Sequence, residues 1–148
     1  MLEEIKNLVY SKYKAEDKNW LFFSLFDDKW NLITSNGVLT SDKSLEETIT
    51  LIYNWIIIKE EKNIKHIIID IVNEVTEQKD VNAFLKMDPK TNWVLLIETK
   101  WDKTWVMLPN MKWVTSMTQV VAWIKSKYQL QWDVAISTFT VTELILNR

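Results

Sequence analysis

The sequence predicts an α+β fold, a single domain in which a mostly antiparallel sheet is packed with about three helices. Helical periodicity occurs in three separate stretches, and the β-branched runs between them are joined by short turns. This order is typical of hairpins and meanders, not of alternating β-α-β units. The length of 148 residues fits one domain, and no repeat, low-complexity tract or Pro/Ser-rich linker divides it. Residues 1–148 are therefore expected to form one domain.

The first half contains two predicted helices separated by a hairpin. Apolar residues recur at helical spacing over residues 2–14, which predicts an amphipathic helix. The run WLFFSLF at 20–26 predicts a buried strand, and the DDKWN that follows predicts a tight turn into a returning strand. Ser44 followed by Glu47 is a capping-box pattern, so a second helix is expected over residues 44–56.

The second half repeats the same kinds of element. They are a long strand at 65–75, one or two helical turns at 81–87, a hairpin formed by 93–99 and 105–108, a helix at 116–128 and a closing strand at 134–146. Ser116 followed by Gln119 repeats the capping-box pattern and places the start of the third helix.

Composition excludes several classes of function. Eighteen basic and twenty acidic residues give a net charge of −2, which argues against a duplex nucleic-acid binder and gives little support to a membrane-surface protein. With no Cys and one His, the usual zinc and thiolate sites are excluded, and neither a metal nor another cofactor is expected. The N-terminal segment does not resemble a signal peptide, and the apolar run LIYNWIII is too short to span a membrane. A cytoplasmic protein is expected.

Glycine and tryptophan are present in abnormal numbers. The chain has one Gly and nine Trp, whereas about ten Gly would be usual at this length. Seven Trp fall where a turn or strand edge is expected: Trp20, Trp30, Trp93, Trp101, Trp105, Trp113 and Trp132. Three hypotheses explain them: ordinary core residues, an aromatic platform, or glycine positions of a bacterial gene in which UGA encodes Gly but was translated as Trp.

The recoding hypothesis makes the most specific statements. It requires UGA codons at the break positions, with Trp55 and Trp123 undecided because they lie inside helical patterns. It also predicts positive φ or distorted turns at several of these Trp, with indoles pointing into solvent. The platform hypothesis instead makes the Trp/Lys stretch at 100–113 a site that stacks the bases of single-stranded nucleic acid.

With Gly read at the break positions, two blocks resemble a known family. Residues 21–39 become LFFSLFDDKGNLITSNGVL, and residues 93–114 become GVLLIETKGDKTGVMLPNMKGV. They are similar to the AMMECR-one domain family, also called AmmeMemoRadiSam system protein A, and the resemblance covers roughly residues 2–146. The resemblance implies an α+β fold with a cleft near an R-G-C-I-G loop, and an accessory role in an unassigned modification pathway. Here Ile33 and Ser35 stand at the family's Arg and Cys positions.

The candidate cleft consists of Ser35, Asn36 and Gly37, together with Pro109 and Asn110. Asn-Gly is a strong turn signal and Pro ends strands, so both segments are simplest as turns. In the family cleft, their hydroxyl and amide groups would bind a small polar ligand or a protein partner. The leading hypothesis is therefore a non-catalytic binding domain.

The alternative is a small hydrolase or transferase that uses Ser35. It would need Ser35 near His66 and an acid such as Asp70, although no G-x-S-x-G elbow supports it. His66, Asp70 and Glu74 share a strand face, but positions four apart on a strand are about 13 Å distant and do not chelate one ion. His66 is expected to be a strand residue paired with a neighbour.

Overall fold

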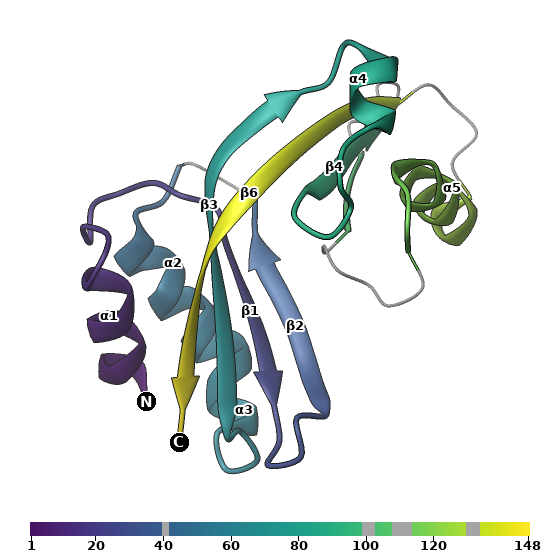
Figure 1. Cartoon of the computed structure of the whole chain (residues 1–148). Coiled ribbons are helices and arrows are strands. Elements are labelled where there is room, and N and C mark those ends of the chain that lie inside the picture. Colours follow the sequence, from purple (N-terminus) through teal and green to yellow (C-terminus); the bar gives the residue numbers. More distant parts are fainter. Residues whose placement is uncertain (40–41, 99–102, 108–113, 130–133) are drawn as a thin grey trace. The chain divides into compact units, whose positions relative to one another are not determined.

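The computed structural model describes residues 1–39, 42–98, 103–107, 114–129 and 134–148 (Figure 1). Contacts within the chain divide it into two compact units. Unit 1 comprises residues 1–72 and 141–148, and unit 2 comprises residues 73–140.

Strand β1 (Leu21–Phe26) lies in the middle of the strands of unit 1. It pairs antiparallel with β2 (Leu32–Val38) on one side and with β3 (His66–Glu77) on the other. The hydrogen-bonded strand order is β2-β1-β3-β6-β4-β5, and β3 and β6 (Val134–Asn147) contribute residues to both units.

The turn between β1 and β2 forms where the sequence predicts it. Asp27 accepts hydrogen bonds from the backbone N–H groups of Lys29 and Asn31, at 2.9 and 2.8 Å, and from the Asn31 side chain. These bonds hold the pKa of the Asp27 carboxyl below its usual value, the Asn31 side-chain bond being the largest cause. An Asx-type turn therefore closes this hairpin.

The helices of unit 1 differ from the prediction at their C-terminal ends. Helix α1 (Leu2–Tyr10) stops before residue 14 because the Ser11 hydroxyl donates to the Leu8 carbonyl at 2.6 Å and the chain then turns. Helix α2 (Leu45–Ile52) begins with the predicted capping box, in which Ser44 and Glu47 bond reciprocally. It continues past residue 56 through a π-helical turn, η1 (Tyr53–Ile57), into α3 (Ile58–Glu60).

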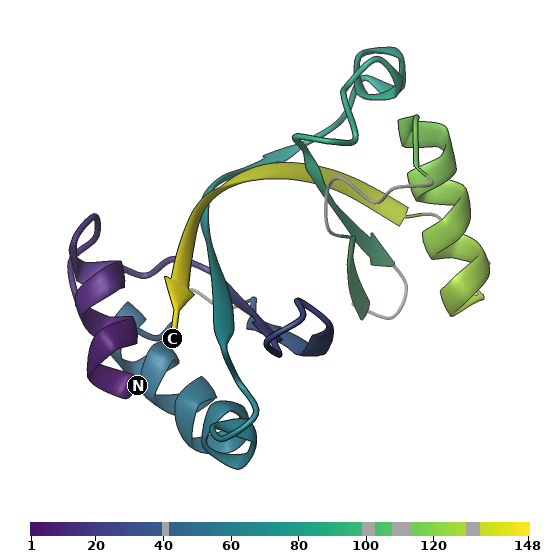
Figure 2. The ribbon, with the colours of Figure 1, turned by 60° about the horizontal axis from the view of Figure 1, so that its bottom comes forward.

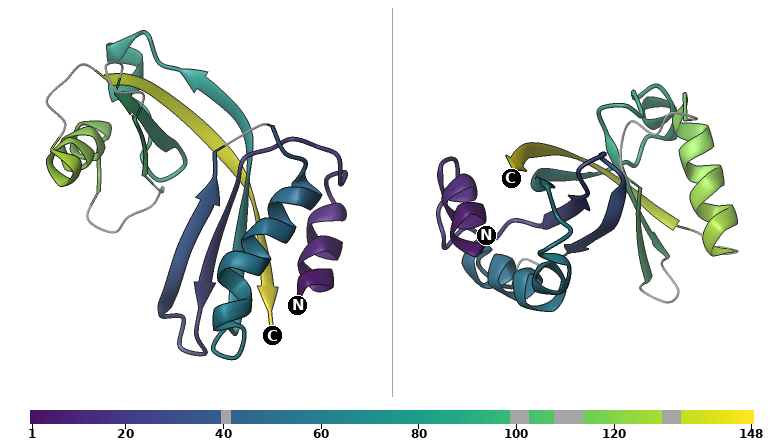
Figure 3. Two further views of the ribbon diagram at one scale, coloured as in Figure 1. Left: turned by 180° about the vertical axis from the view of Figure 1, so that it is seen from behind. Right: turned by 90° about the horizontal axis from the view of Figure 1, so that it is seen from below.

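These helices cover one face of the unit 1 strands, as Figure 3 shows for α1 and α2. Alternate residues of β1 and β3 point toward them, since side chains on a strand alternate between faces. Fully buried members of the resulting core are Ile5, Val9, Leu21, Phe23, Leu25, Leu45, Ile49, Ile57, Ile67, Ile69 and Ile71.

Unit 2 contains the remaining elements. Strand β4 (Trp93–Glu98) pairs antiparallel with β5 (Lys103–Met107) and with the first half of β6. The helices are α4 (Val81–Leu85), capped by Asp80, and α5 (Met117–Tyr128), capped by Ser116. Figure 2 shows α5 beside these strands. The core between them contains Phe84, Val94, Leu96, Val114, Met117, Val120 and Ile124.

The predicted α+β class and its antiparallel sheet are confirmed, and the helix predicted at 116–128 is observed as α5. The strands predicted at 20–26, 65–75 and 134–146 are observed with ends shifted by one or two residues.

Trp30 has the backbone conformation that a glycine position would have, whereas Trp93 does not. Trp30 has φ 60°, and its indole is 48% exposed. Trp93 does not have positive φ, and its indole is buried against Phe139 at a centroid distance of 5.3 Å. The prediction of a solvent-facing indole in a glycine conformation is therefore wrong for Trp93, because the residue begins a strand and fills space beside an aromatic neighbour.

The remaining five tryptophans at predicted breaks provide no further support for a glycine conformation. Trp20 does not have positive φ and is half-buried, so the prediction is wrong there too. Trp105 lies within β5. Trp101, Trp113 and Trp132 lie outside the described residues.

The backbone conformation of Trp30 predicts an unusual order of stability. Ala and Gly both remove the indole and its stacking on His66, but only Gly adopts φ 60° without strain. We expect Trp30→Gly to be more stable than Trp30→Ala by about 1 kcal/mol in urea unfolding.

Trp55 provides the matched control, since it is 68% exposed but lies in the helical η1 turn. There the order should reverse, with Ala more stable than Gly by about 0.5–1 kcal/mol. If Ala is the more stable substitution at both positions, the positive φ of Trp30 carries no strain.

Candidate functional site

The candidate residues Ser35, Asn36 and Gly37 lie in strand β2, so the prediction that they form a turn is wrong. The turn that the sequence requires is made instead by Asp27–Asn31, which leaves β2 free to extend along β1. Gly37 does not have positive φ. The Asn-Gly signal fails here because pairing with β1 supplies more backbone hydrogen bonds than a local turn would.

Ser35 lies directly opposite Ser24 of β1, and the two hydroxyl oxygens are 3.0 Å apart. Either hydroxyl can be the donor. Ser24 is 8% exposed, whereas Ser35 is exposed. This hydrogen bond satisfies the buried Ser24 hydroxyl and fixes the orientation of the Ser35 hydroxyl at the surface.

Gly37 is opposite Phe22, and the aromatic ring occupies the space that a side chain would need. A Cβ atom built on Gly37 would lie 2.1 Å from the Cδ1 atom of Phe22 and 2.8 Å from its Cγ atom. Phe22 is 8% exposed. The only glycine of the chain is thus needed for close approach of an aromatic ring across the strands, not for a turn.

Strand β2 is an edge strand of the sheet and carries no charged residue. Its sequence, LITSNGV, contains neither a charged residue nor proline, the residues that commonly protect an edge strand. The Gly37 N–H donates to the Asn36 side-chain oxygen at 2.8 Å, so this N–H points away from β1. Backbone N–H groups alternate in direction along a strand, so residues two apart point the same way. The Ser35 N–H therefore also points to the outer edge of β2.

A register shift in β2 places Ile33 against the core. Between Leu25 and Phe26 of β1, the pairing moves from Thr34 to Leu32, which leaves Ile33 as the extra residue of a β-bulge. Ile33 packs against the core of unit 1. An Ile suits this position, whereas a guanidinium there would need a buried partner.

Asp70 of β3 has a buried carboxyl. It is paired with Phe22 of β1, which is two residues from Ser24, so the side chains of Asp70 and Ser24 point to the same face of the sheet. It is 6% exposed, and the described residues form no hydrogen bond or ion pair with it. Burial, and secondarily the negative charge of Glu143, raises the pKa of Asp70 to about 7. The burial of this carboxyl was not predicted, because Asp70 is a single acid within an isoleucine-rich strand.

The described residues bring no base to Ser35. His66 pairs with Phe26 on the β3 side of β1, whereas Ser35 lies on the β2 side, and strands two apart are separated by roughly 9–10 Å. As predicted, His66 is paired with neighbours. Its Nδ1 atom is 2.8 Å from Asn147 Oδ1, and its ring stacks on Trp30 at 4.0 Å. A Ser-His-Asp relay through Ser35 is therefore not assembled.

The other candidate residues, Pro109 and Asn110, lie outside the described residues, as does most of the Trp/Lys stretch at 100–113. Within the described part of the chain, His, Asp and Glu side chains do not gather in threes around a potential metal site. No described helix is long and apolar enough to cross a membrane.

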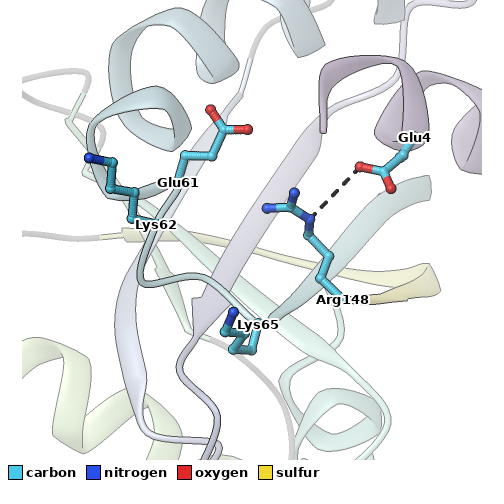
Figure 4. Close-up of a pocket in the computed structure, with 5 residues that line it drawn as sticks. All are labelled: Glu4, Glu61, Lys62, Lys65 and Arg148. Atoms are coloured by element: carbon cyan, nitrogen blue, oxygen red, sulfur yellow. Dashed lines mark ion pairs between the residues drawn. The ribbon is translucent and has the colours of Figure 1, made fainter.

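Unit 1 also contains an open pocket that the sequence did not indicate (Figure 4). Its volume is about 560 Å³, and it is lined by Glu4, Glu61, Lys62, Lys65 and Arg148. These residues come from α1, the turn after α3, the residue before β3 and the residue after β6. Their separation in sequence explains why no local motif reveals the pocket. Unit 2 has a smaller polar pocket of about 220 Å³ that includes Glu74, Gln78 and Asn92.

Comparison with known proteins establishes the fold but not a family. The sequence matches no family model and no curated protein. The structure is similar to the crystal structure of an uncharacterized protein from Pyrococcus horikoshii, with a TM-score of 0.69 and 14% sequence identity. The match covers 90% of this chain and 80% of that chain. At this identity, the likeness supports the α+β fold alone.

The close contact between Gly37 and Phe22 predicts that Gly37→Ala destabilises the protein. The added methyl group would have to displace a buried ring, at a cost of about 1–3 kcal/mol in urea unfolding. In a Phe22→Leu background the same change should cost clearly less, because the ring is absent. Equal costs in the two backgrounds would show that Phe22 does not set the requirement for glycine.

The raised pKa of Asp70 predicts a specific pH dependence. The folded state binds this proton more tightly than the unfolded state, whose pKa is near 3.8. The free energy of unfolding should therefore be greatest below about pH 4 as far as this group is concerned, and should fall as pH rises toward 7. The limiting loss is on the order of 4 kcal/mol.

Asp70→Asn removes the titration while keeping the shape of the side chain. The difference in unfolding free energy between this variant and wild type should change by that amount between pH 4 and pH 8, measured in urea. A difference that does not vary with pH would show that the carboxyl is solvated in the folded protein.

Proposed function

We propose that this chain is a non-catalytic binding domain of the AMMECR-one type, which engages a protein partner through the outer edge of β2. The accessory role in a modification pathway rests on the resemblance of residues 21–39 and 93–114 to that family. The binding mode rests on the structure of the Ser35–Gly37 segment, which the resemblance places at the family's cleft loop.

The supporting observation is an edge strand without protecting residues. Ser35 and Asn36 are exposed, and β2 carries no charge or proline that would repel an incoming strand. Strand addition uses the outward backbone N–H and C=O groups for affinity and alternate side chains for specificity. Ser35 offers such an outward N–H, and Leu32, which is 57% exposed, offers an apolar contact on the same strand.

A catalytic role for Ser35 has less support. Its hydroxyl is held by Ser24, which is itself neutral and buried, and His66 and Asp70 lie in β3, on the other side of β1 from Ser35. An activated serine needs a base within hydrogen-bond reach. The pairing instead suits a hydroxyl that holds the strand in a fixed position for binding.

Two substitutions at one position test the proposal. Ser35→Pro removes an outward N–H without removing a hydrogen bond to β1, a position where edge strands accept proline. Ser35→Ala removes the hydroxyl but keeps the backbone. Peptides selected against the wild-type chain from an unbiased display library should bind Ser35→Ala with affinity within about twofold of wild type and should lose binding to Ser35→Pro, as measured by fluorescence anisotropy.

Circular dichroism would verify that both variants fold. If the selected peptides bind Ser35→Pro as well as wild type, they do not add to this edge and the proposed binding mode is wrong. Labelling of the wild-type protein by a fluorophosphonate probe, abolished in Ser35→Ala but kept in Ser24→Ala, would instead favour the enzyme.

A further inference from the structure

The pocket in Figure 4 combines three cationic side chains in a protein whose net charge is −2. We propose that this pocket binds a small ligand through a phosphate group, either inorganic phosphate or a phosphate monoester. Lys62, Lys65 and Arg148 would hold the phosphate oxygens. This inference concerns a part of unit 1 other than the β2 edge, so the two proposals stand or fall separately.

Arg148 is oriented by the acid beside it. Its Nε atom lies 3.8 Å from the Glu4 carboxylate, as the dashed line in Figure 4 marks. A guanidinium that faces a carboxylate with its Nε edge keeps the edge formed by its two terminal nitrogens for another partner. That edge can bind two phosphate oxygens in a bidentate manner. The Arg148 side chain is 32% exposed, so the group is partly desolvated but accessible.

The backbone beneath the two lysines is fixed. The Lys65 N–H donates to the Phe26 carbonyl at 2.9 Å, and its carbonyl accepts from the Arg148 N–H at 2.8 Å. Lys62 lies in a turn closed by hydrogen bonds from the Asn63 and Ile64 N–H groups to the Glu60 carbonyl. The three cations are therefore attached to held positions, which lowers the entropy lost when they close on one anion.

The two acids of the pocket have other partners. Glu4 is 3.0 Å from the Met1 ammonium group, and the hydrogen bond to this group is the main reason that its pKa lies below the usual value. The Glu61 carboxylate accepts a hydrogen bond from the Tyr53 hydroxyl at 3.2 Å. By contrast, the described residues form no ion pair with Lys62 or Lys65. The side chains that line the pocket thus carry three positive and two negative charges, and both lysines are without an ion-pair partner among the described residues.

The dimensions of the pocket favour a small ligand over a polymer. Its volume of about 560 Å³ lies within the range of small-molecule sites. Polyanion binders show a basic face, with pI above about 9 for the domain, whereas the pI here is about 5.5. Three cations around one cavity match the charge of a single phosphate group better than a backbone of many phosphates.

The test is titration of the ¹⁵N-labelled full chain with inorganic phosphate and, separately, with methyl phosphate, at low ionic strength and constant pH. Saturable amide shifts should appear at residues 61–65 and 148. Lys62→Gln combined with Lys65→Gln should weaken binding at least about tenfold, and Arg148→Lys should weaken it through loss of the bidentate geometry. Tighter binding of methyl phosphate would identify an organic phosphate as the ligand, and equal or weaker binding would identify the free anion.

The matched control is Lys12→Gln combined with Lys14→Gln, which removes the same charge from exposed lysines outside the pocket. This control should change the affinity by less than about twofold. An equal loss in the control and pocket variants would overturn the proposal, since binding would then follow net charge alone. The absence of saturable shifts up to roughly 10 mM phosphate would also overturn it.

Discussion

Unit 1 depends on the pairing of β1 with two neighbours at once. Five of the six residues of β1 are buried, because the strand is hydrogen-bonded on both edges and covered by helices on one face. A strand in this position has one register, since a shift by one residue would turn Leu21, Phe23 and Leu25 away from the core. The positions of the β2 and β3 side chains that matter for function follow from this register.

The face of β1 opposite the helices shows what the register achieves. Phe22 meets the bare backbone of Gly37 on one side and Asp70 on the other, and Ser24 meets Ser35. An aromatic ring fills the space above glycine, while the two hydroxyls satisfy each other. On this face the described residues form no hydrogen bond or ion pair with the Asp70 carboxyl, and burial raises its pKa. This strand face therefore combines satisfied packing with one carboxyl whose ionisation opposes stability at neutral pH.

Periodicity and capping signals located most of the elements, because burial of one face and satisfaction of helix ends act locally. The capping signals at Ser44 and Ser116 marked the helix starts to the residue, since both serines are N-caps. Helix ends were predicted less well, since α1 ends at a serine that bonds its own helix and α2 continues through a π turn. The Ser35–Gly37 segment was misassigned because a local turn signal competes with strand pairing, which depends on residues distant in sequence.

The pocket of Figure 4 could not be predicted for a related reason. Its cations are ordinary surface lysines and a terminal arginine in the sequence, and only the strand ends bring them to one cavity. Likewise, nothing in the strand HIIIDIV distinguishes Asp70 from a solvated acid until the burial of both faces of β3 is known. Functional residues on loops with special geometry leave a sequence signal, whereas residues assembled by tertiary pairing do not.

In the described residues, positive φ does not occur at the glycine but at two other residues. Among the described residues, positive φ occurs at Trp30 and at Gln129, which ends α5 in the left-handed conformation usual for a glycine cap. The single glycine occupies a strand, where it provides space. Replacement of glycine by tryptophan through UGA would account for Trp30 but not for Gln129, and Trp93 fills a buried position as a core tryptophan does. The tryptophans therefore do not share one structural role, and each break position must be judged from its own backbone angle and burial.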